Sequence, residues 1–108
     1  MEEEIDKFYL PTERTKGREE CFLLKIRGDS MGDANITEGD YVLIERYQTA
    51  HNRDIVAVAL GDEATLKRFM QMGDTILLVP ENAKYKPIQV RSDQVNVLGK
   101  VIGVLKKQ

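Results

Sequence analysis

The sequence predicts an all-β, barrel-like domain, because its apolar residues fall into short runs separated by turn residues. Many short strands at regular spacing are typical of a barrel or a sandwich. No stretch shows the long 3.6-residue period of an amphipathic helix. A length of 108 residues suits one domain, and 42% hydrophobic with 31% charged residues allows one modest core.

Three strands are expected in the first 60 residues. Residues 22–26 are apolar and favour a strand, and residues 41–44 follow the turn residues 38–40. Residues 55–60 contain no polar side chain. A short run of this kind indicates a strand that is buried on both faces.

Four further strands are expected after residue 60. Gly61-Asp62 is a tight-turn signal, so residues 63–70 should return as a hairpin partner. Residues 75–79 end at a proline, and residues 88–90 and 95–105 complete the set. We expect residues 1–20, which are polar and acid-rich, to form a loosely attached lead-in to a domain over residues 21–108.

Charge and composition exclude several classes of function. A net charge of −2 and a pI near 5.4 argue against nucleic-acid binding by this chain alone. No apolar run approaches the ~18–20 residues of a membrane span. Cys21 is the only cysteine and is expected to be a buried core thiol; one cysteine and one histidine do not make a structural zinc site. We therefore expect no metal, no cofactor, no membrane contact and a cytoplasmic location.

Ser30 lies in Gly28-Asp29-Ser30-Met31-Gly32, which fits the G-x-S-x-G pattern of a nucleophilic serine. The α/β-hydrolase fold that carries this pattern needs a helix directly after the serine, and residues 32–35 are a poor start for one. A Ser-His-Asp triad would have to use His51, the only histidine, which we expect to be a surface residue of a polar loop. The pattern alone is therefore a weak signal.

A serine can instead be activated by a neutral lysine. Because the pKa of a free lysine is about 10.4, its amine must be desolvated before it can accept a proton. Lys67 fits, since it lies on the return strand of a hairpin whose first strand is apolar. Strand alternation places Thr65 on the same side, where its hydroxyl could orient the amine. A surface lysine on an amphipathic strand is the alternative from the pattern alone.

Several segments around these two residues match one known family. They are residues 24–31 with the serine, residues 38–44, residues 54–59, and residues 62–69 with the lysine. The set resembles the LexA-type serine peptidases, which comprise SOS repressors, UmuD-like mutagenesis proteins and self-cleaving phage repressors. Residues 78–82, 86–88 and 98–104 resemble the repressors specifically, and the interval between Ser30 and Lys67 suits the family.

The resemblance implies a fold of several short coiled sheets with a small barrel, like that of LexA and of signal peptidases. It also implies that Ser30 is the nucleophile and Lys67 the general base. Backbone N–H groups of Asp29 and Ser30 would form the oxyanion hole. Gly28 would let the backbone turn tightly into the site. Met31 follows the nucleophile, where filling a core gap is as plausible a role as contacting substrate.

The resemblance further implies partners. A repressor of this family has a helix-turn-helix domain, a linker with a cleavable small-residue–Gly bond, and then the catalytic domain. No Ala-Gly or Cys-Gly pair occurs in the sequence. We therefore expect the chain to correspond to the C-terminal self-cleavage and dimerisation domain, with DNA bound only through an N-terminal domain that is missing here. The expected partners are the RecA filament on single-stranded DNA, as activator, and a second copy that pairs through residues 97–105.

Three other interpretations stay open. The chain could be a UmuD-like polymerase accessory protein or another relative within the same family. It could be a signal-peptidase-like enzyme, although that group usually carries a membrane anchor. It could also be a non-catalytic β-barrel interaction module in which Ser30 and Lys67 are only structural.

Overall fold

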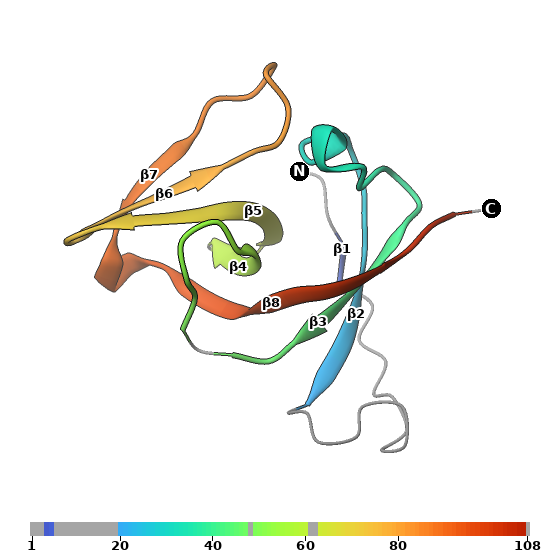
Figure 1. Cartoon of the computed structure of the whole chain (residues 1–108), viewed down its shortest axis with the longest axis horizontal. Coiled ribbons are helices and arrows are strands. Elements are labelled where there is room, and N and C mark those ends of the chain that lie inside the picture. Colours follow the sequence, from blue (N-terminus) through green and yellow to red (C-terminus); the bar gives the residue numbers. More distant parts are fainter. Residues whose placement is uncertain (1–3, 6–19, 48, 61–62, 108) are drawn as a thin grey trace.

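The computed structural model describes residues 4–5, 20–47, 49–60 and 63–107. Within these ranges eight antiparallel strands form one sheet in the order β1-β2-β3-β8-β4-β5-β6-β7 (Figure 1). The strands are β1 (Glu4–Ile5), β2 (Cys21–Lys25), β3 (Tyr41–Glu45), β4 (Ile55–Leu60), β5 (Glu63–Met72), β6 (Thr75–Val79), β7 (Ile88–Arg91) and β8 (Asn96–Leu105).

The all-β prediction is confirmed, and the seven expected strands are all present with bounds that differ by at most two residues. The structure refines the expectation of several sheets with a small barrel. The strands form a single coiled sheet, and over the described residues this sheet is not closed, because no pairing joins β7 to β1. β1 nevertheless comes close to β5 as well as pairing with β2. The sheet therefore wraps most of the way around its core.

The long strand β8 is the reason why one sheet forms. Its first half pairs with β4, from Asn96 to Lys100, and its second half pairs with β3, from Lys100 to Leu105. Both ladders shift register partway, and such irregularities bend a strand and increase its twist. β8 consequently crosses the whole molecule and joins the β4–β7 part to the β2–β3 part (Figure 1).

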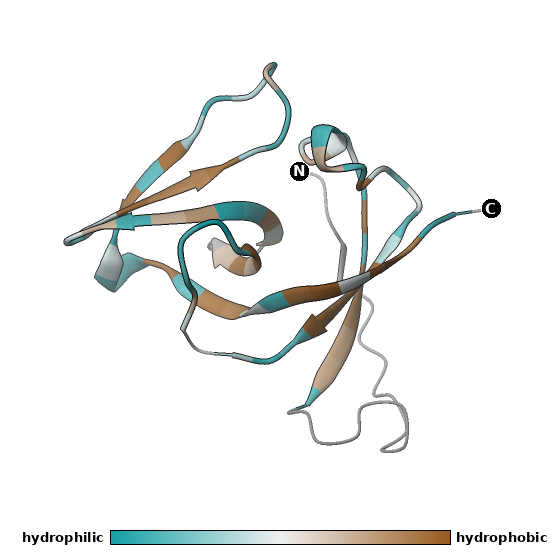
Figure 2. Cartoon of the chain, viewed as in Figure 1, coloured by the Kyte–Doolittle hydropathy of each residue, from teal (hydrophilic) through white to brown (hydrophobic). Residues whose placement is uncertain are grey.

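Two hydrophobic clusters lie on the two faces of β4. The first core consists of Phe22, Leu24, Ile26, Met31, Ile36, Val42, Ile44, Ala57 and Leu66. The second core consists of Val56, Val58, Phe69, Ile76 and Leu78. Neighbouring residues of β4 thus enter different cores, which confirms the prediction of a strand that is buried on both faces. Hydrophobic residues accordingly recur along both parts of the sheet (Figure 2).

Short 3₁₀ helices at Gly32–Ala34 and Ser92–Gln94 are the helical elements in the described ranges. None of the helices among the described residues has the length and apolar character to cross a membrane. Most of the expected lead-in and the expected turn at residues 61–62 lie outside the described residues. The described part of the lead-in, β1, is paired with β2.

Candidate functional site

Ser30 lies in the connection between β2 and β3, on a turn that begins at Gly28. The φ angle of Gly28 is +82°, a backbone conformation that glycine adopts without steric strain. Its N–H donates to Glu38 Oε1 at 3.0 Å, which closes the connection on itself. Ser30 is half-buried, whereas Met31 is only 2% exposed and packs in the first core. The expected tight turn at Gly28 is thus confirmed, and Met31 anchors the serine to the core.

The residues after Ser30 form a single 3₁₀ turn rather than a long helix. The N–H of Gly32 donates to Asp29 O at 3.1 Å, and the N–H of Asn35 donates to Gly32 O at 2.9 Å. Asn35 ends the turn in the left-handed conformation, which asparagine tolerates better than most residues. The local structure agrees with the prediction that Ser30 does not lie on an α/β-hydrolase elbow.

Residues that follow β6 hold the Ser30 turn in place. The N–H of Glu81 donates to Ser30 O at 2.8 Å, and its carbonyl accepts the N–H of Asp33 at 2.7 Å. The Glu81 carboxylate also accepts from Arg68 on β5 at 3.2 Å. Glu81 therefore links the Ser30 turn to the strand that carries Lys67. Glu81 belongs to residues 78–82, which resemble the repressors, but a glutamate after a proline gives no signal of this structural role.

The side chain of Asp29 makes a second set of contacts with the same segment. Lys84 Nζ lies 2.7 Å from Asp29 Oδ2, and the hydroxyl of Tyr85 donates to Oδ1 at 2.5 Å. The hydrogen bond from Lys84, followed by that from Tyr85, lowers the pKa of Asp29. Reciprocally, the hydrogen bond to Asp29 raises the pKa of Lys84 and that of Tyr85. The carboxylate is thus held in its charged form by Lys84 and Tyr85.

Lys67 lies on β5 opposite Val56 of β4 and is only 7% exposed. Its Nζ donates to Thr65 Oγ1 at 2.6 Å and to Leu66 O at 2.9 Å. Burial of the amine rules out the alternative of a surface lysine on an amphipathic strand. The contact with Thr65 is the one that strand alternation suggested.

The first core joins the neighbours of the two candidate residues. Met31, next to Ser30, and Leu66, next to Lys67, belong to the same buried cluster. Together with the contacts of Glu81, this packing connects the Ser30 turn to the strand that carries Lys67. The catalytic roles of Ser30 and Lys67, and of the N–H groups of Asp29 and Ser30, stay predictions.

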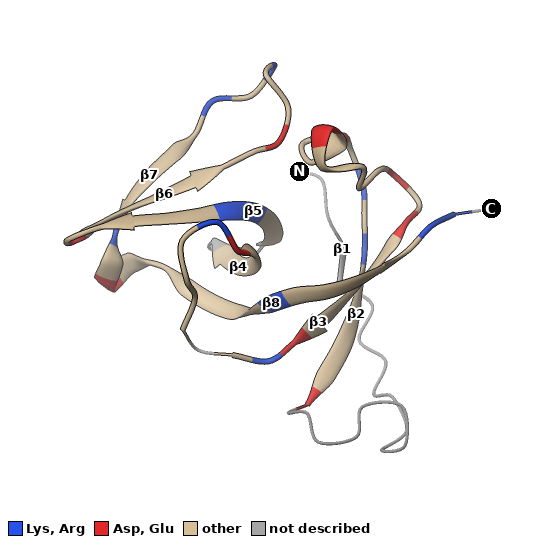
Figure 3. Ribbon diagram, in the orientation of Figure 1, with Lys and Arg blue, Asp and Glu red and all other residues tan. Residues whose placement is uncertain are grey.

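The remaining residues with reactive side chains have ordinary surroundings. The His51 side chain is 87% exposed, and its Nδ1 lies 3.8 Å from Asp54 Oδ2, as expected for a surface loop. Cys21 is buried, as expected. Among the residues that the structure describes, no three His, Cys, Asp or Glu side chains are grouped to hold a metal ion. Positively and negatively charged residues are interspersed along the ribbon (Figure 3).

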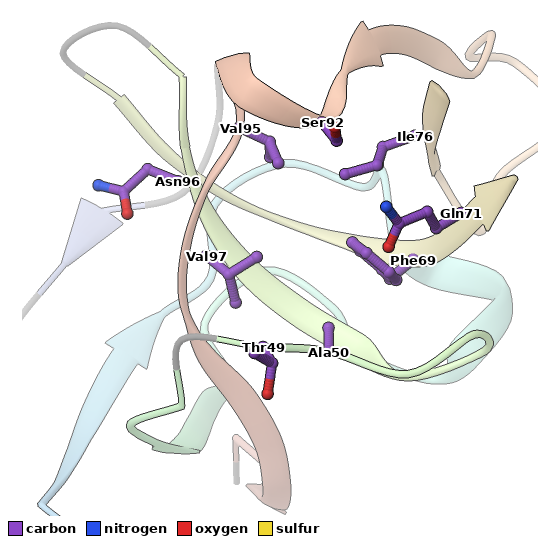
Figure 4. A pocket seen from close by; sticks show the side chains of 9 residues that line it. All are labelled: Thr49, Ala50, Phe69, Gln71, Ile76, Ser92, Val95, Asn96 and Val97. Atoms are coloured by element: carbon purple, nitrogen blue, oxygen red, sulfur yellow. The ribbon is translucent and has the colours of Figure 1, made fainter. Parts of the chain in front are cut away.

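A cavity of about 330 Å³ lies beside the second core, between β5, β6 and the region that leads into β8. Phe69, Ile76, Val95 and Val97 point toward its centre (Figure 4). Neither Ser30 nor Lys67 lines it. This hollow is therefore separate from the candidate catalytic residues.

Comparison with known proteins identifies the family. Residues 1–102 match the family model described as Peptidase S24-like. The chain is 48% identical to the LexA repressor of Koribacter versatilis over 92 residues, which are 84% of this chain and 44% of that protein. It is 43% identical to the LexA repressor of Clostridium tetani over 102 residues, which are 94% of this chain and 50% of that protein. It is 42% identical to the LexA repressor of Ruminiclostridium cellulolyticum over 107 residues, which are 99% of this chain and 49% of that protein.

The chain spans about half the length of the curated relatives that it matches. The family model, by contrast, covers nearly the whole chain. The chain therefore belongs to the Peptidase S24-like family of serine peptidases and is a LexA-like domain of that family.

Proposed function

We propose that the chain is the C-terminal self-cleavage and dimerisation domain of a LexA-like repressor of the SOS response. In this proposal, a Ser30–Lys67 dyad hydrolyses an Ala-Gly-type bond in the linker of the longer protein. The observation that carries it is the burial of Lys67, which is only 7% exposed on β5. Burial favours the neutral form of an amine, and only the neutral form can take a proton from serine.

The proposed chemistry is that of a neutral lysine acting as general base for a serine. The Lys67 amine takes the proton of the Ser30 hydroxyl as Oγ bonds to the carbonyl carbon of the linker. The carbon–nitrogen bond then breaks, and the Lys67 ammonium returns the proton to the leaving amine. Water, deprotonated by Lys67, attacks the resulting ester and releases Ser30 with its proton. One base thus serves both halves of the reaction.

Backbone N–H groups of Asp29 and Ser30 would stabilise the negative charge that develops on the linker carbonyl oxygen. The peptide plane between Asp29 and Ser30 is held firmly, because Asp29 O accepts from Gly32 N at 3.1 Å and from Asn82 Nδ2 at 2.7 Å. The Ser30 N–H points away from that carbonyl in the same plane, so its direction is fixed before any substrate binds. Preorganised donors of this kind supply much of the stabilisation of a transition state.

The partners of the longer protein follow from the same proposal. A linker in the same chain reaches the site at a high effective concentration, so little intrinsic affinity is needed. The RecA filament on single-stranded DNA would promote cleavage by favouring the cleavable conformation rather than by adding a catalytic group. Cleavage would separate the DNA-binding domain from its dimeriser in the cytoplasm and end repression. This domain itself would contact no DNA.

Dimerisation is the second proposed task, and the second half of β8 is its proposed surface. Among the described residues, this half is paired with β3 only, which leaves its other edge available to a copy of itself. Val104 and Leu105 at its end are 40% and 56% exposed. Two such edges can pair around a two-fold axis, where the same surface meets itself.

A cleavage assay in trans tests the dyad. The domain, mixed at alkaline pH with a peptide that contains a central Ala-Gly bond, should cleave that bond, and mass spectrometry should detect both products. Ser30→Ala should abolish cleavage, because the attacking oxygen is lost. Ser92→Ala is the matched control, since Ser92 is the other serine of the chain, and it should cleave like the wild type. Equal cleavage by Ser30→Ala, or none by the wild type, would instead favour a non-catalytic interaction module.

Analytical ultracentrifugation tests the dimer. The wild type should sediment as a dimer at high micromolar concentration, and Leu105→Glu should shift it toward monomer because it places two charges in an apolar contact. Met72→Glu is the control, since Met72 is 66% exposed on the distant β5–β6 hairpin. A monomeric wild type, or equal effects of both changes, would contradict this use of β8.

A further inference from the structure

The chain after β8 folds back onto the loop that follows Ser30. Lys106 Nζ lies among four oxygens of this loop: Asn35 O at 2.8 Å, Asn35 Oδ1 at 3.5 Å, Thr37 Oγ1 at 3.4 Å and Asp40 Oδ2 at 2.5 Å. The contacts with Asn35 O and Asp40 Oδ2 are short hydrogen bonds, and the contact with Asp40 is also an ion pair. We call these four oxygens the oxygen cage; the Lys106 side chain that contacts them is itself 44% exposed.

Asp40 is the buried, charged member of this oxygen cage. It is completely buried and accepts from the N–H and hydroxyl of Thr37 and from the N–H of Lys107 as well as from Lys106. Burial by itself would raise the pKa of Asp40, but the hydrogen bonds from Lys106, from the Lys107 N–H and from Thr37 outweigh it and hold the pKa well below its usual range. The carboxylate therefore stays charged and keeps Lys106 in place.

A series of hydrogen bonds, joined through the backbone of Asn35 and Gly32, leads from Lys106 to the backbone beside Ser30. Lys106 Nζ donates to Asn35 O, the N–H of Asn35 donates to Gly32 O, and the N–H of Gly32 donates to Asp29 O. Asp29 O belongs to the peptide plane that sets the direction of the Ser30 N–H. Asn35 holds a left-handed conformation with φ of 61°, so the bond from Lys106 also stabilises the least favourable backbone of the turn.

We propose that Lys106 is a positioning residue for the Ser30 turn, which it holds through Asn35 and Asp40 in the geometry needed for attack. The inference rests on the proposed function of Ser30 as nucleophile and adds a residue that touches neither the serine nor the substrate. It also gives the segment after β8 a role in positioning the nucleophile. A displacement of about 1 Å in such a turn is enough to slow a reaction by 10²-fold.

Two measurements on the same variants test this role. The first is the rate at which a fluorophosphonate probe labels Ser30, followed by intact-mass spectrometry over a range of pH. The second is hydrogen exchange of the Gly32 and Asn35 N–H groups by NMR, which does not depend on reactivity. Lys106→Met should slow labelling about 10- to 100-fold at every pH and speed exchange at both amides. Lys106→Arg should recover most of the rate, because it restores a charged donor to the cage.

Lys107→Met is the matched control, because it removes the same charge one residue later while the bond to Asp40 comes from the Lys107 backbone. It should label like the wild type. If Lys106→Met does not fold, Lys106→Gln replaces it, with a neutral donor that should give an intermediate rate. A wild type that is never labelled would overturn the proposed function. Unchanged exchange of the Gly32 and Asn35 N–H groups in Lys106→Met would overturn the proposal that Lys106 holds the Ser30 turn. Labelling of a Lys106 variant at the wild-type rate would overturn the inference alone.

Discussion

Replacing Lys67 by methionine is expected to slow the acylation of Ser30 by about 10²- to 10⁴-fold, the usual contribution of a general base. Methionine fills a similar volume but cannot accept a proton. The change also removes the hydrogen bonds to Thr65 Oγ1 and Leu66 O, so the free energy of unfolding should fall by no more than about 1–2 kcal/mol. The fluorophosphonate labelling rate measures the first effect, and thermal unfolding measures the second.

The control for this change is Lys86→Met, which makes the same replacement at an exposed lysine before β7. It should leave both the labelling rate and the unfolding temperature unchanged. The contrast separates loss of the base from the general effect of replacing a lysine by methionine. If Lys67→Met is labelled as fast as Lys86→Met, Lys67 is a structural residue of β5 and the dyad is wrong.

Local patterns predicted the strands well because each strand carries its own signal. The wholly apolar run of β4 indicated burial on both faces, and its alternate residues do enter two different cores. Pairing carries no such local signal. The pattern of β8 indicates a strand but cannot say that its two halves pair with β4 and β3, which is why one sheet forms where several were expected. β1, with two residues, is too short to be predicted from any pattern.

The candidate site could likewise be predicted only in part from the sequence. Ser30 and Lys67 are predicted from a motif, from the apolar surroundings of a hairpin and from a family resemblance. The contacts of their supporting residues were not predicted, even within the matching segment 78–82, because contacts between distant segments leave no trace in spacing. Glu81 holds Ser30 through its backbone N–H, a group that every residue except proline has. Lys106, at the charged end of the chain, resembles any solvated lysine until its four oxygen neighbours are seen.

Gly99 should be the position in β8 at which a single methyl group is most destabilising. A Cβ atom there would lie 2.4 Å from the backbone oxygen of Glu45 and 2.6 Å from Ile44 Cγ2. Because backbone cannot move aside as a flexible side chain can, Gly99→Ala must push β3 away from β8. We expect the free energy of unfolding to fall by about 3 kcal/mol, a large share of the total stability of a domain this size. Urea denaturation followed by circular dichroism measures the change.

Gly103 in the same strand provides the matched control for Gly99→Ala. A Cβ atom at Gly103 would meet only Leu43 Cβ at 3.8 Å, which is ordinary van der Waals contact. Gly103→Ala should therefore change the unfolding free energy by less than about 0.5 kcal/mol, or raise it, because alanine restricts the unfolded chain. Both variants make the same chemical change in one strand, so only the separation of β8 from β3 distinguishes them. Equal stability of the two variants would mean that the crossing of β8 over β3 is looser than the structure has it, and the single coiled sheet would lose its central contact.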